Sequence, residues 1–252
     1  MTRILCVDIE TIPQERYTKP ATYDRVDGGE IECDAAWLDN LRLPEDGLVN
    51  LGALCGEIEA GQAVLKATGV VPALHPTTAR VVSVNFGWTH GDTAKTEVRA
   101  LPDFIDSTML DALHTEATEA KLVLEALQRV RGALDKDTRI VGFHSKGFDL
   151  PMLRVRAALL RITGVPTLPW GKLLYPFDNR MHCDLRLVLS NDDRRARGTQ
   201  QHWAEAFGIH SEERGAEVFQ MAREGRWDDI RAYGHSEGKT LVELFKAVEP
   251  VL

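Results

Sequence analysis

The chain has 252 residues, of which 44% are hydrophobic and 27% charged, and its formal net charge is −8. This size and composition predict a globular protein with one large domain or one domain carrying an insertion. No apolar run reaches the roughly 20 residues that span a bilayer, the amino terminus has no apolar signal-peptide core, and none of the 4 cysteines forms a Cys-x-x-Cys. We therefore expect a cytoplasmic protein with no membrane partner, disulfide framework or zinc site.

The hydrophobic pattern predicts an α/β fold. Residues 13–75 are acidic, show no clear strand pattern and include a helix-like stretch over 51–67, so we interpret them as an insertion at the sheet edge. The remaining elements, in chain order, are a buried strand at 2–9, a hairpin of strands at 80–87 and 96–100, a helix at 118–134, a strand at 138–143, a helix at 150–160, a strand at 181–189, short helices near 199–207 and 216–224, and a helix at 228–248. This order predicts a mixed sheet of five strands, an antiparallel hairpin plus parallel strands, with helices on both faces.

Acidic residues mark three places in this pattern. Asp8 and Glu10 end the first strand at i and i+2, so both carboxylates face one side. Asp149 follows a later strand as a helix begins, and Tyr233 and Glu237 share one face of the last helix. Each signal alone has an ordinary structural explanation: exposed acids at a strand end, a helix N-cap and a common i,i+4 pair. Together, acids held on one fold need cations, and carboxylate ligands without thiolate or imidazole favour Mg²⁺ or Mn²⁺.

Basic residues are concentrated around Asp149, although the chain as a whole is acidic. Residues 139–200 contain 11 Lys or Arg against 5 Asp or Glu, including Lys146 and a loop with Arg194, Arg195 and Arg197. A basic zone beside an acidic metal cluster suits a phosphodiester substrate. The alternative is a set of solvated helix faces and a solvated loop.

Three segments resemble one protein family. They are Val-Asp-Ile-Glu-Thr-Ile-Pro around Asp8, the block Gly-Phe-His-Ser-Lys-Gly-Phe-Asp-Leu-Pro-Met-Leu around Asp149, and His-Cys-Asp-Leu at residues 182–185. They are similar to predicted 3′–5′ exonucleases related to the proofreading domain of B-family DNA polymerases, in the DEDDy group of the RNase H-like (DnaQ-like) superfamily. The resemblance covers most of the chain and implies an RNase H-like fold, with residues 1–252 forming a single exonuclease domain interrupted by the insertion at about 13–75.

The resemblance also implies roles for the acids. Asp8 and Glu10 match the first exonuclease motif, Asp149 the second, and Tyr233 and Glu237 the third, where the family usually has Asp in place of Glu237. These acids would bind two Mg²⁺ or Mn²⁺ ions, and Tyr233 would orient the attacking water. We do not count Asp184 as a ligand, and we expect His182 to be structural.

For the substrate we expect a nucleic acid 3′ end, with single-stranded DNA favoured and mononucleotides released. The candidate contacts are Thr11, Ile12, His144, Lys146, Phe148, Arg194, Arg195 and Arg197. His144 stands where the family usually has Asn. A polymerase or a replication or repair protein could act as a partner in trans, because the chain has no polymerase segment.

Two other functions stay open. The departures at His144 and Glu237 suggest a weak or inactive module that binds nucleic-acid ends on the same fold. The acidic insertion suggests instead a phosphoesterase acting on a small nucleotide, with the insertion closing over the site.

Overall fold

The computed structural model describes residues 2–13, 76, 79–105, 116–191, 198–211 and 214–252, together with four short strands between residues 21 and 64. The chain divides into two compact units, Met1–Thr11 with Val81–Leu252 and Ile12–Arg80. Each unit is described by itself below. The predicted arrangement as one domain with an insertion at about 13–75 stays a prediction.

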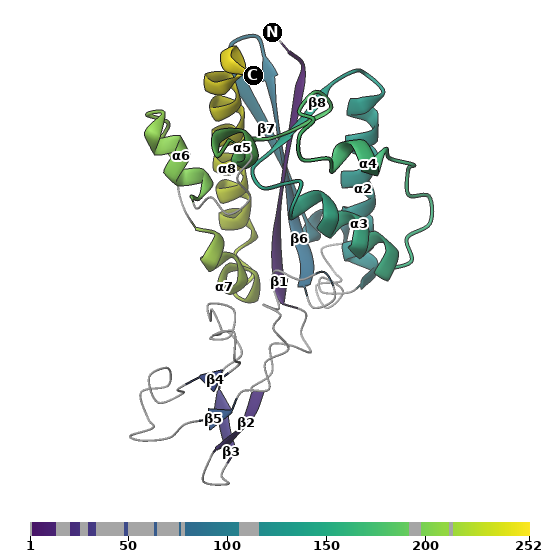
Figure 1. Cartoon of the computed structure of the whole chain (residues 1–252). Coiled ribbons are helices and arrows are strands. Elements are labelled where there is room, and N and C mark those ends of the chain that lie inside the picture. Colours follow the sequence, from purple (N-terminus) through teal and green to yellow (C-terminus); the bar gives the residue numbers. More distant parts are fainter. Residues whose placement is uncertain are drawn as a thin grey trace. The chain divides into compact units, whose positions relative to one another are not determined.

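A mixed sheet of five strands organises the first unit (Figure 1). Its strands lie in the order β7-β6-β1-β8-β9. β6 and β7 pair antiparallel, whereas β8 runs parallel to both β1 and β9. The strands are β1 (Ile4–Pro13), β6 (Ala79–His90), β7 (Thr93–Ala100), β8 (Arg139–Gly142) and β9 (His182–Asp184). The predicted combination of an antiparallel hairpin and parallel strands is confirmed.

Helices cover both faces of this sheet (Figure 1). α2 and α3 lie on one face, and α8 lies on the other, beside α6 and α7. The helices are α2 (Glu116–Leu134), α3 (Asp149–Leu159), α4 (Trp170–Leu173), α5 (Leu185–Leu189), α6 (Gln200–Ala206), α7 (Val218–Arg223) and α8 (Trp227–Val248). Short 3₁₀ turns occur at Leu101–Phe104, Gly215–Glu217 and Glu249–Val251. None of the helices in the described ranges is both long and apolar enough to cross a membrane.

One predicted strand is shorter than expected. We predicted a strand over 181–189, but β9 ends at Asp184 and residues 185–189 form α5. The Asp184 side chain accepts a hydrogen bond from the backbone N–H of Arg186, which is a helix N-cap contact. The apolar run Leu-Arg-Leu-Val-Leu fits a buried strand or a helix equally well. The N-cap hydrogen bond to Asp184 favours the helix.

Residues 12–80 contain short strands that the sequence did not reveal. β2 (Ala21–Arg25), β3 (Glu30–Cys33), β4 (Leu48–Val49) and β5 (Ala63–Val64) form a second sheet in the order β3-β2-β5-β4. The helix-like prediction for 51–67 is wrong at Ala63 and Val64, which are paired strand residues. Its other residues lie outside the described part of the chain. Strands of two to five residues are too short for alternation to be recognised.

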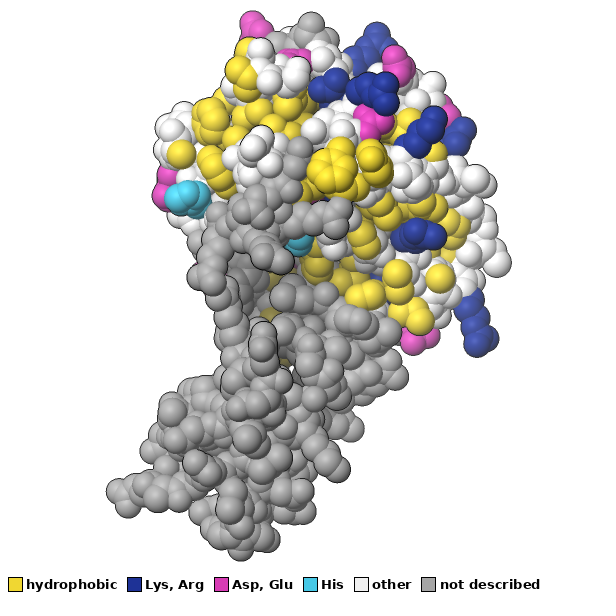
Figure 2. Space-filling view, in the orientation of Figure 1, with side chains coloured by type: hydrophobic (Ala, Val, Ile, Leu, Met, Phe, Trp, Pro, Cys, Tyr) yellow, Lys and Arg dark blue, Asp and Glu magenta, His cyan; other side chains and the backbone are white. Residues whose placement is uncertain are grey.

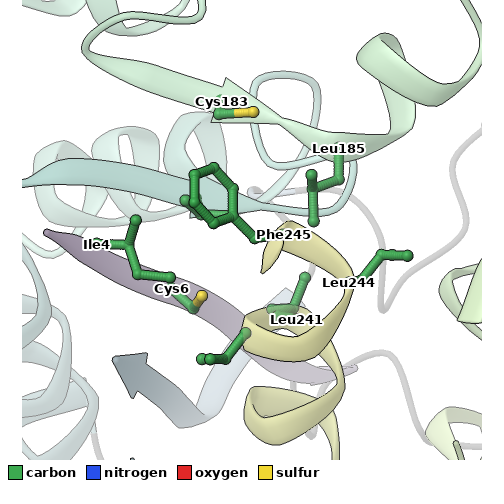
Figure 3. Close-up of a cluster of buried hydrophobic side chains, with 9 residues drawn as sticks. Ile4, Cys6, Cys183, Leu185, Leu241, Leu244 and Phe245 are labelled. Atoms are coloured by element: carbon green, nitrogen blue, oxygen red, sulfur yellow. The ribbon is translucent and has the colours of Figure 1, made fainter. Parts of the chain in front are cut away.

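The core between the five-stranded sheet and α8 is apolar (Figure 3). Alternate residues of β1, Ile4 and Cys6, join Leu241 and Phe245 of α8 in one buried cluster. The other members are Val141, Cys183, Leu185, Val242 and Leu244. Cys6 and Cys183 are free thiols. The cluster fixes which face of β1 looks toward α8.

Glycines let α8 lie close to the sheet at its middle. A Cβ on Gly87 of β6 would come within 2.7 Å of the Gly238 carbonyl oxygen on α8, and a Cβ on Gly238 would meet Thr96 Cγ2 at 3.2 Å. Real Cβ atoms tolerate the first contact only if the backbone moves. The helix backbone therefore packs directly against β6 and β7.

Candidate active site

The first strand and the last helix bring the predicted acids together. Side chains two apart on a strand share a face, so Asp8 and Glu10 continue the row of Ile4 and Cys6 toward α8. Figure 1 shows the start of β1 and the end of α8 at the same end of the fold, so the two run in opposite directions. The six-residue step from Ile4 to Glu10 advances the strand by about 20 Å. A helix needs about 12 residues, or about 18 Å, to cover a similar length. Tyr233, 12 residues before Phe245, therefore lies near the Glu10 end.

Asp8 is held by an amide from the neighbouring strand. Asn85 Nδ2 donates a hydrogen bond of 2.7 Å to Asp8 Oδ2. Asn85 is buried in β6, which lies next to β1 in the sheet. The bond fixes one oxygen of Asp8 without bringing a positive charge to it.

Asp149 joins the same site through the backbone of β1. It is the first residue of α3 and is 2% exposed. Its Oδ1 accepts a 3.0 Å hydrogen bond from the backbone N–H of Ile9, which lies between Asp8 and Glu10. The helix N-cap position is Phe148 and not Asp149, so the simple capping explanation does not account for this carboxylate.

Tyr233 and Glu237 both turn their side chains into the protein. Glu237 is buried, and its Oε2 accepts a 2.8 Å hydrogen bond from Gln200 Nε2 on α6. The Tyr233 hydroxyl accepts a hydrogen bond from the backbone N–H of Arg214. Burial, followed by the charges of Glu10 and Glu237, raises the Tyr233 pKa, so the phenol stays neutral and keeps its O–H as a donor.

The four carboxylates destabilise one another's charge. Burial raises the pKa of Asp8 from 3.8 to about 6, even though it accepts hydrogen bonds. Burial is the largest cause that raises the pKa of Glu10, and the charges of Asp8, Glu237 and Asp149 raise it further. The pKa of Asp149 is raised by burial and then by Asp8. Hydrogen bonds from Asn85 to Asp8 and from the Ile9 backbone to Asp149 oppose these increases only in part.

This donor set fits a hard divalent cation. All the candidate ligands are carboxylate oxygens, which Mg²⁺ and Mn²⁺ prefer, and their mutual repulsion is relieved by positive charge. Among the residues that the structure describes, no three Asp, Glu, His or Cys side chains already form a group that could hold an ion. The charges of Asp8, Asp149 and Glu237 nevertheless all act on Glu10, so the four acids lie in one neighbourhood.

The loop before Asp149 is built on Asp184. The buried Asp184 carboxylate accepts hydrogen bonds of 2.9 Å from the backbone N–H groups of both His144 and Lys146. His144 has φ +63°, a left-handed conformation that His and Asn tolerate better than most residues. This shared tolerance explains why a His can stand where the resembled family usually has Asn. Asp184 thus supports the loop, and its charge also contributes to raising the pKa of Asp149.

A second buried contact fixes the same loop. Ser145 Oγ lies 2.8 Å from His182 Nε2, and His182 Nδ1 lies 2.8 Å from the Leu173 carbonyl oxygen. Because the carbonyl can only accept, Nδ1 carries the proton and Nε2 accepts from the Ser145 hydroxyl. Burial lowers the His182 pKa from 6.5 to about 3, so the ring stays neutral. This geometry supports the structural role that we expected for His182.

The candidate substrate-binding residues differ in burial and in their contacts. The Lys146 ammonium donates to the carbonyl oxygens of Pro176 and Asp178 and to Asn179 Oδ1, at 3.0–3.3 Å, which favours a role in holding that segment. His144 is exposed, and Phe148 is half-buried. Thr11 is half-buried and Ile12 is buried at the end of β1. Arg194, Arg195 and Arg197 lie outside the described residues.

Basic side chains are spread over the surface rather than gathered at one point. On the face in Figure 2, Lys and Arg lie mainly over the half that carries α2, α3 and α4. Some basic residues near Asp149 in the sequence serve the fold instead. Arg156 is buried in an ion pair with Glu119, and Arg180 pairs with Asp178.

Sequence reasoning missed the groups that hold the acids. Asn85 and Gln200 contact Asp8 and Glu237, and the Arg214 backbone contacts Tyr233. The only local signal for Asn85 was a polar residue inside the strand Val-Val-Ser-Val-Asn-Phe. No local signal marked Gln200.

A comparison with protein families supports the resemblance. The model of a family described as predicted 3′–5′ exonucleases related to the exonuclease domain of PolB matches residues 74–239, which is 166 of the 252 residues. The match includes Asp149, Tyr233 and Glu237 and begins after Asp8 and Glu10. A search of curated proteins gave no match. With its RNase H-like mixed sheet and this match, the chain belongs to the family of predicted 3′–5′ exonucleases related to the PolB exonuclease domain.

Proposed function

We propose that the protein is a metal-dependent 3′–5′ exonuclease that hydrolyses the terminal phosphodiester of a nucleic acid and releases mononucleotides. The observation that carries this proposal is the closeness of Asp8, Asp149 and Glu237, from distant parts of the chain, to Glu10, whose pKa is raised by burial and then by their charges. Two Mg²⁺ or Mn²⁺ ions bound there would lower the pKa of the attacking water and stabilise the leaving 3′-oxygen.

The chain's own groups have separate tasks in this proposal. Asp8, Asp149, Glu10 and Glu237 hold the ions, with Asp149 fixed by the Ile9 backbone. The backbone N–H of Arg214 holds the neutral Tyr233 hydroxyl. This hydroxyl can accept a hydrogen bond from the attacking water and so orient it. Asp8 and Glu10 are half-buried and not fully enclosed, as a site that receives a substrate phosphate requires.

For the substrate we favour a single-stranded DNA 3′ end. Thr11 and Ile12 follow the first acids directly, and Phe148 precedes Asp149, so these residues are suited to contact the terminal nucleotide. Stacking and backbone contacts accept any base, which predicts low sequence preference. A role in repair or proofreading would place a polymerase or a replication protein as a partner in trans.

The test is degradation of a 5′-labelled single strand with Mg²⁺ or Mn²⁺. Asp8→Asn and Glu237→Gln should each reduce the rate by at least the roughly 10- to 100-fold that loss of supporting groups causes at metal sites. The matched controls are Asp92→Asn, an exposed turn residue, and Glu243→Gln, six residues further along α8. Both controls should retain the parental rate.

Other outcomes distinguish the alternatives. Binding of 3′ ends without turnover under any divalent ion would favour the end-binding module. Mononucleotides that compete as well as oligomers would favour the small-nucleotide phosphoesterase. An Asp8→Asn variant as fast as the parent would contradict the proposed site.

A further inference from the structure

Asn85 occupies a position that stability alone does not explain. It is 1% exposed, and its Oδ1 is a buried atom without a hydrogen-bond partner among the described residues. That oxygen lies where a Cβ on Gly234 of α8 would collide with it. A buried amide with one unsatisfied group costs about 1–3 kcal/mol compared with a satisfied one. An apolar side chain at this position of the strand would avoid this cost. We therefore explain the presence of Asn85 by the contact that its amide nitrogen makes.

That contact is the 2.7 Å hydrogen bond to Asp8 Oδ2. Gln200 makes an equivalent contact on the far side of the site. It is 8% exposed, begins α6, and donates from Nε2 to Glu237 Oε2 at 2.8 Å and to the Glu237 carbonyl oxygen at 3.4 Å. Two candidate metal ligands from opposite ends of the chain are therefore each held by a buried side-chain amide.

The neutral charge of these donors matters. An Arg or Lys in either place would pair with the carboxylate, lower its pKa and compete with a metal ion for its charge. An amide restricts the carboxylate rotamer and leaves the full negative charge to the cation.

We propose that Asn85 and Gln200 are positioning residues that orient the Asp8 and Glu237 carboxylates for divalent-metal binding without neutralising them. This inference rests on the proposed function, since it assigns the two amides to the same metal site. They act through the carboxylates and need not touch the substrate.

The test measures metal binding directly in the full chain. Asn85→Leu and Gln200→Met replace each amide by an apolar side chain of similar size, and Gln201→Met is the control because the neighbouring Gln201 bonds to the exposed Glu205 instead. Calorimetric titration with Mn²⁺ alone should show an affinity lowered roughly 10- to 100-fold in the first two variants. Gln201→Met should bind Mn²⁺ like the parent.

Thermal unfolding without metal separates positioning from folding. Asn85→Leu should melt near the parental temperature, because removal of the unsatisfied amide oxygen offsets loss of the hydrogen bond to Asp8. In nuclease assays, both positioning variants should need more Mn²⁺ for half-maximal rate, and excess Mn²⁺ should restore most of the rate.

Two results would overturn the inference. If folded Asn85→Leu and Gln200→Met bind Mn²⁺ as tightly as the parent, the amides serve packing only while the proposed function stands. If the parent binds no Mn²⁺, the proposed metal site fails and the inference fails with it. If Asn85→Leu does not fold, Gln200→Met on the peripheral helix α6 decides the question alone.

Discussion

Replacing Asp8 by Asn should stabilise the metal-free protein while removing its nuclease activity. Asn keeps the shape of Asp and can still accept the hydrogen bond that Asn85 donates. It removes one charge from a buried group of acids. If the acids form a ligand cluster without neutralising cations, loss of one acid should improve stability and abolish function.

The size of the effect follows from the pKa of Asp8. Its rise from 3.8 to about 6 is about two units, and each unit corresponds to about 1.4 kcal/mol, so ionised Asp8 destabilises the fold by up to about 3 kcal/mol. Because Asp8 is half-buried, solvent screening lowers this limit, and we expect about 1–2 kcal/mol. For a unit of this size, a gain of that amount raises the melting temperature by about 2–8 °C.

The pH dependence gives a second check with a fixed sign. The folded protein binds the Asp8 proton more tightly than the unfolded chain, since its pKa is about 6 against 3.8. The parent therefore loses stability as the pH rises from about 4 to 6, and the loss is complete above the folded pKa. The advantage of Asp8→Asn should be largest above pH 6 and should vanish near pH 4.

The assay is thermal unfolding of both proteins between pH 4 and pH 8, with a chelator and again with Mn²⁺. Mn²⁺ should raise the melting temperature of the parent by mass action and that of Asp8→Asn much less. Asp92→Asn, in an exposed turn, serves as the control for loss of one acid. A metal-free Asp8→Asn protein that is no more stable than the parent at pH 7 would refute the reasoning from buried, unneutralised charge.

Further substitutions test the packing of the five-stranded unit. Gly234→Ala should lose about 1–3 kcal/mol and most nuclease activity, because its Cβ would collide with the buried amide on β6. Gly132→Ala on α2, where a Cβ meets nothing, should instead gain up to about 1 kcal/mol, and urea unfolding would contradict us if the two behaved alike. Arg156→Met should cost roughly 3–5 kcal/mol in urea unfolding by leaving Glu119 buried without its bidentate partner, and adding Glu119→Gln should recover part of that loss. The parent should lose stability relative to His182→Asn as the pH falls from 6.5 toward 3, because the His182 ring binds a proton in the unfolded chain but not when it is buried. If the difference in stability between the two proteins stays constant across this pH range, the ring is not buried in its neutral form.

The sequence was sufficient to predict the elements with strong periodicity. The apolar run before Asp8 predicted β1, but the strand extends to Pro13 and the predicted end at residue 9 is wrong, so Asp8 and Glu10 lie inside it. The amphipathic pattern of the last helix predicted α8 within a residue of its start. The i,i+2 spacing of Asp8 and Glu10 correctly predicted that both face one side. These features depend on residues close together in the chain, for which strand and helix periods are reliable guides.

Contacts between distant residues could not be predicted in this way. Asn85 reaches Asp8 across 77 residues, and Gln200 reaches Glu237 across 37. The charge of Lys146 suggested a substrate contact, but only the folded chain shows three acceptors around its ammonium. The early end of β9 had a different cause, because the local N-cap hydrogen bond between Asp184 and Arg186 outweighed an ambiguous apolar run.

Packing explains why the acids cannot relieve their repulsion by moving apart. At one end of α8, Leu241 and Phe245 are fixed in the apolar cluster with β1. In its middle, the contact between Gly87 and Gly238 leaves no side chain between helix and sheet. A shift of α8 along β1 would place carboxylates against apolar side chains, which costs more than their repulsion in place. Uptake of protons or of cations is then the remaining route to lower charge, and the proposed function assigns that role to divalent ions.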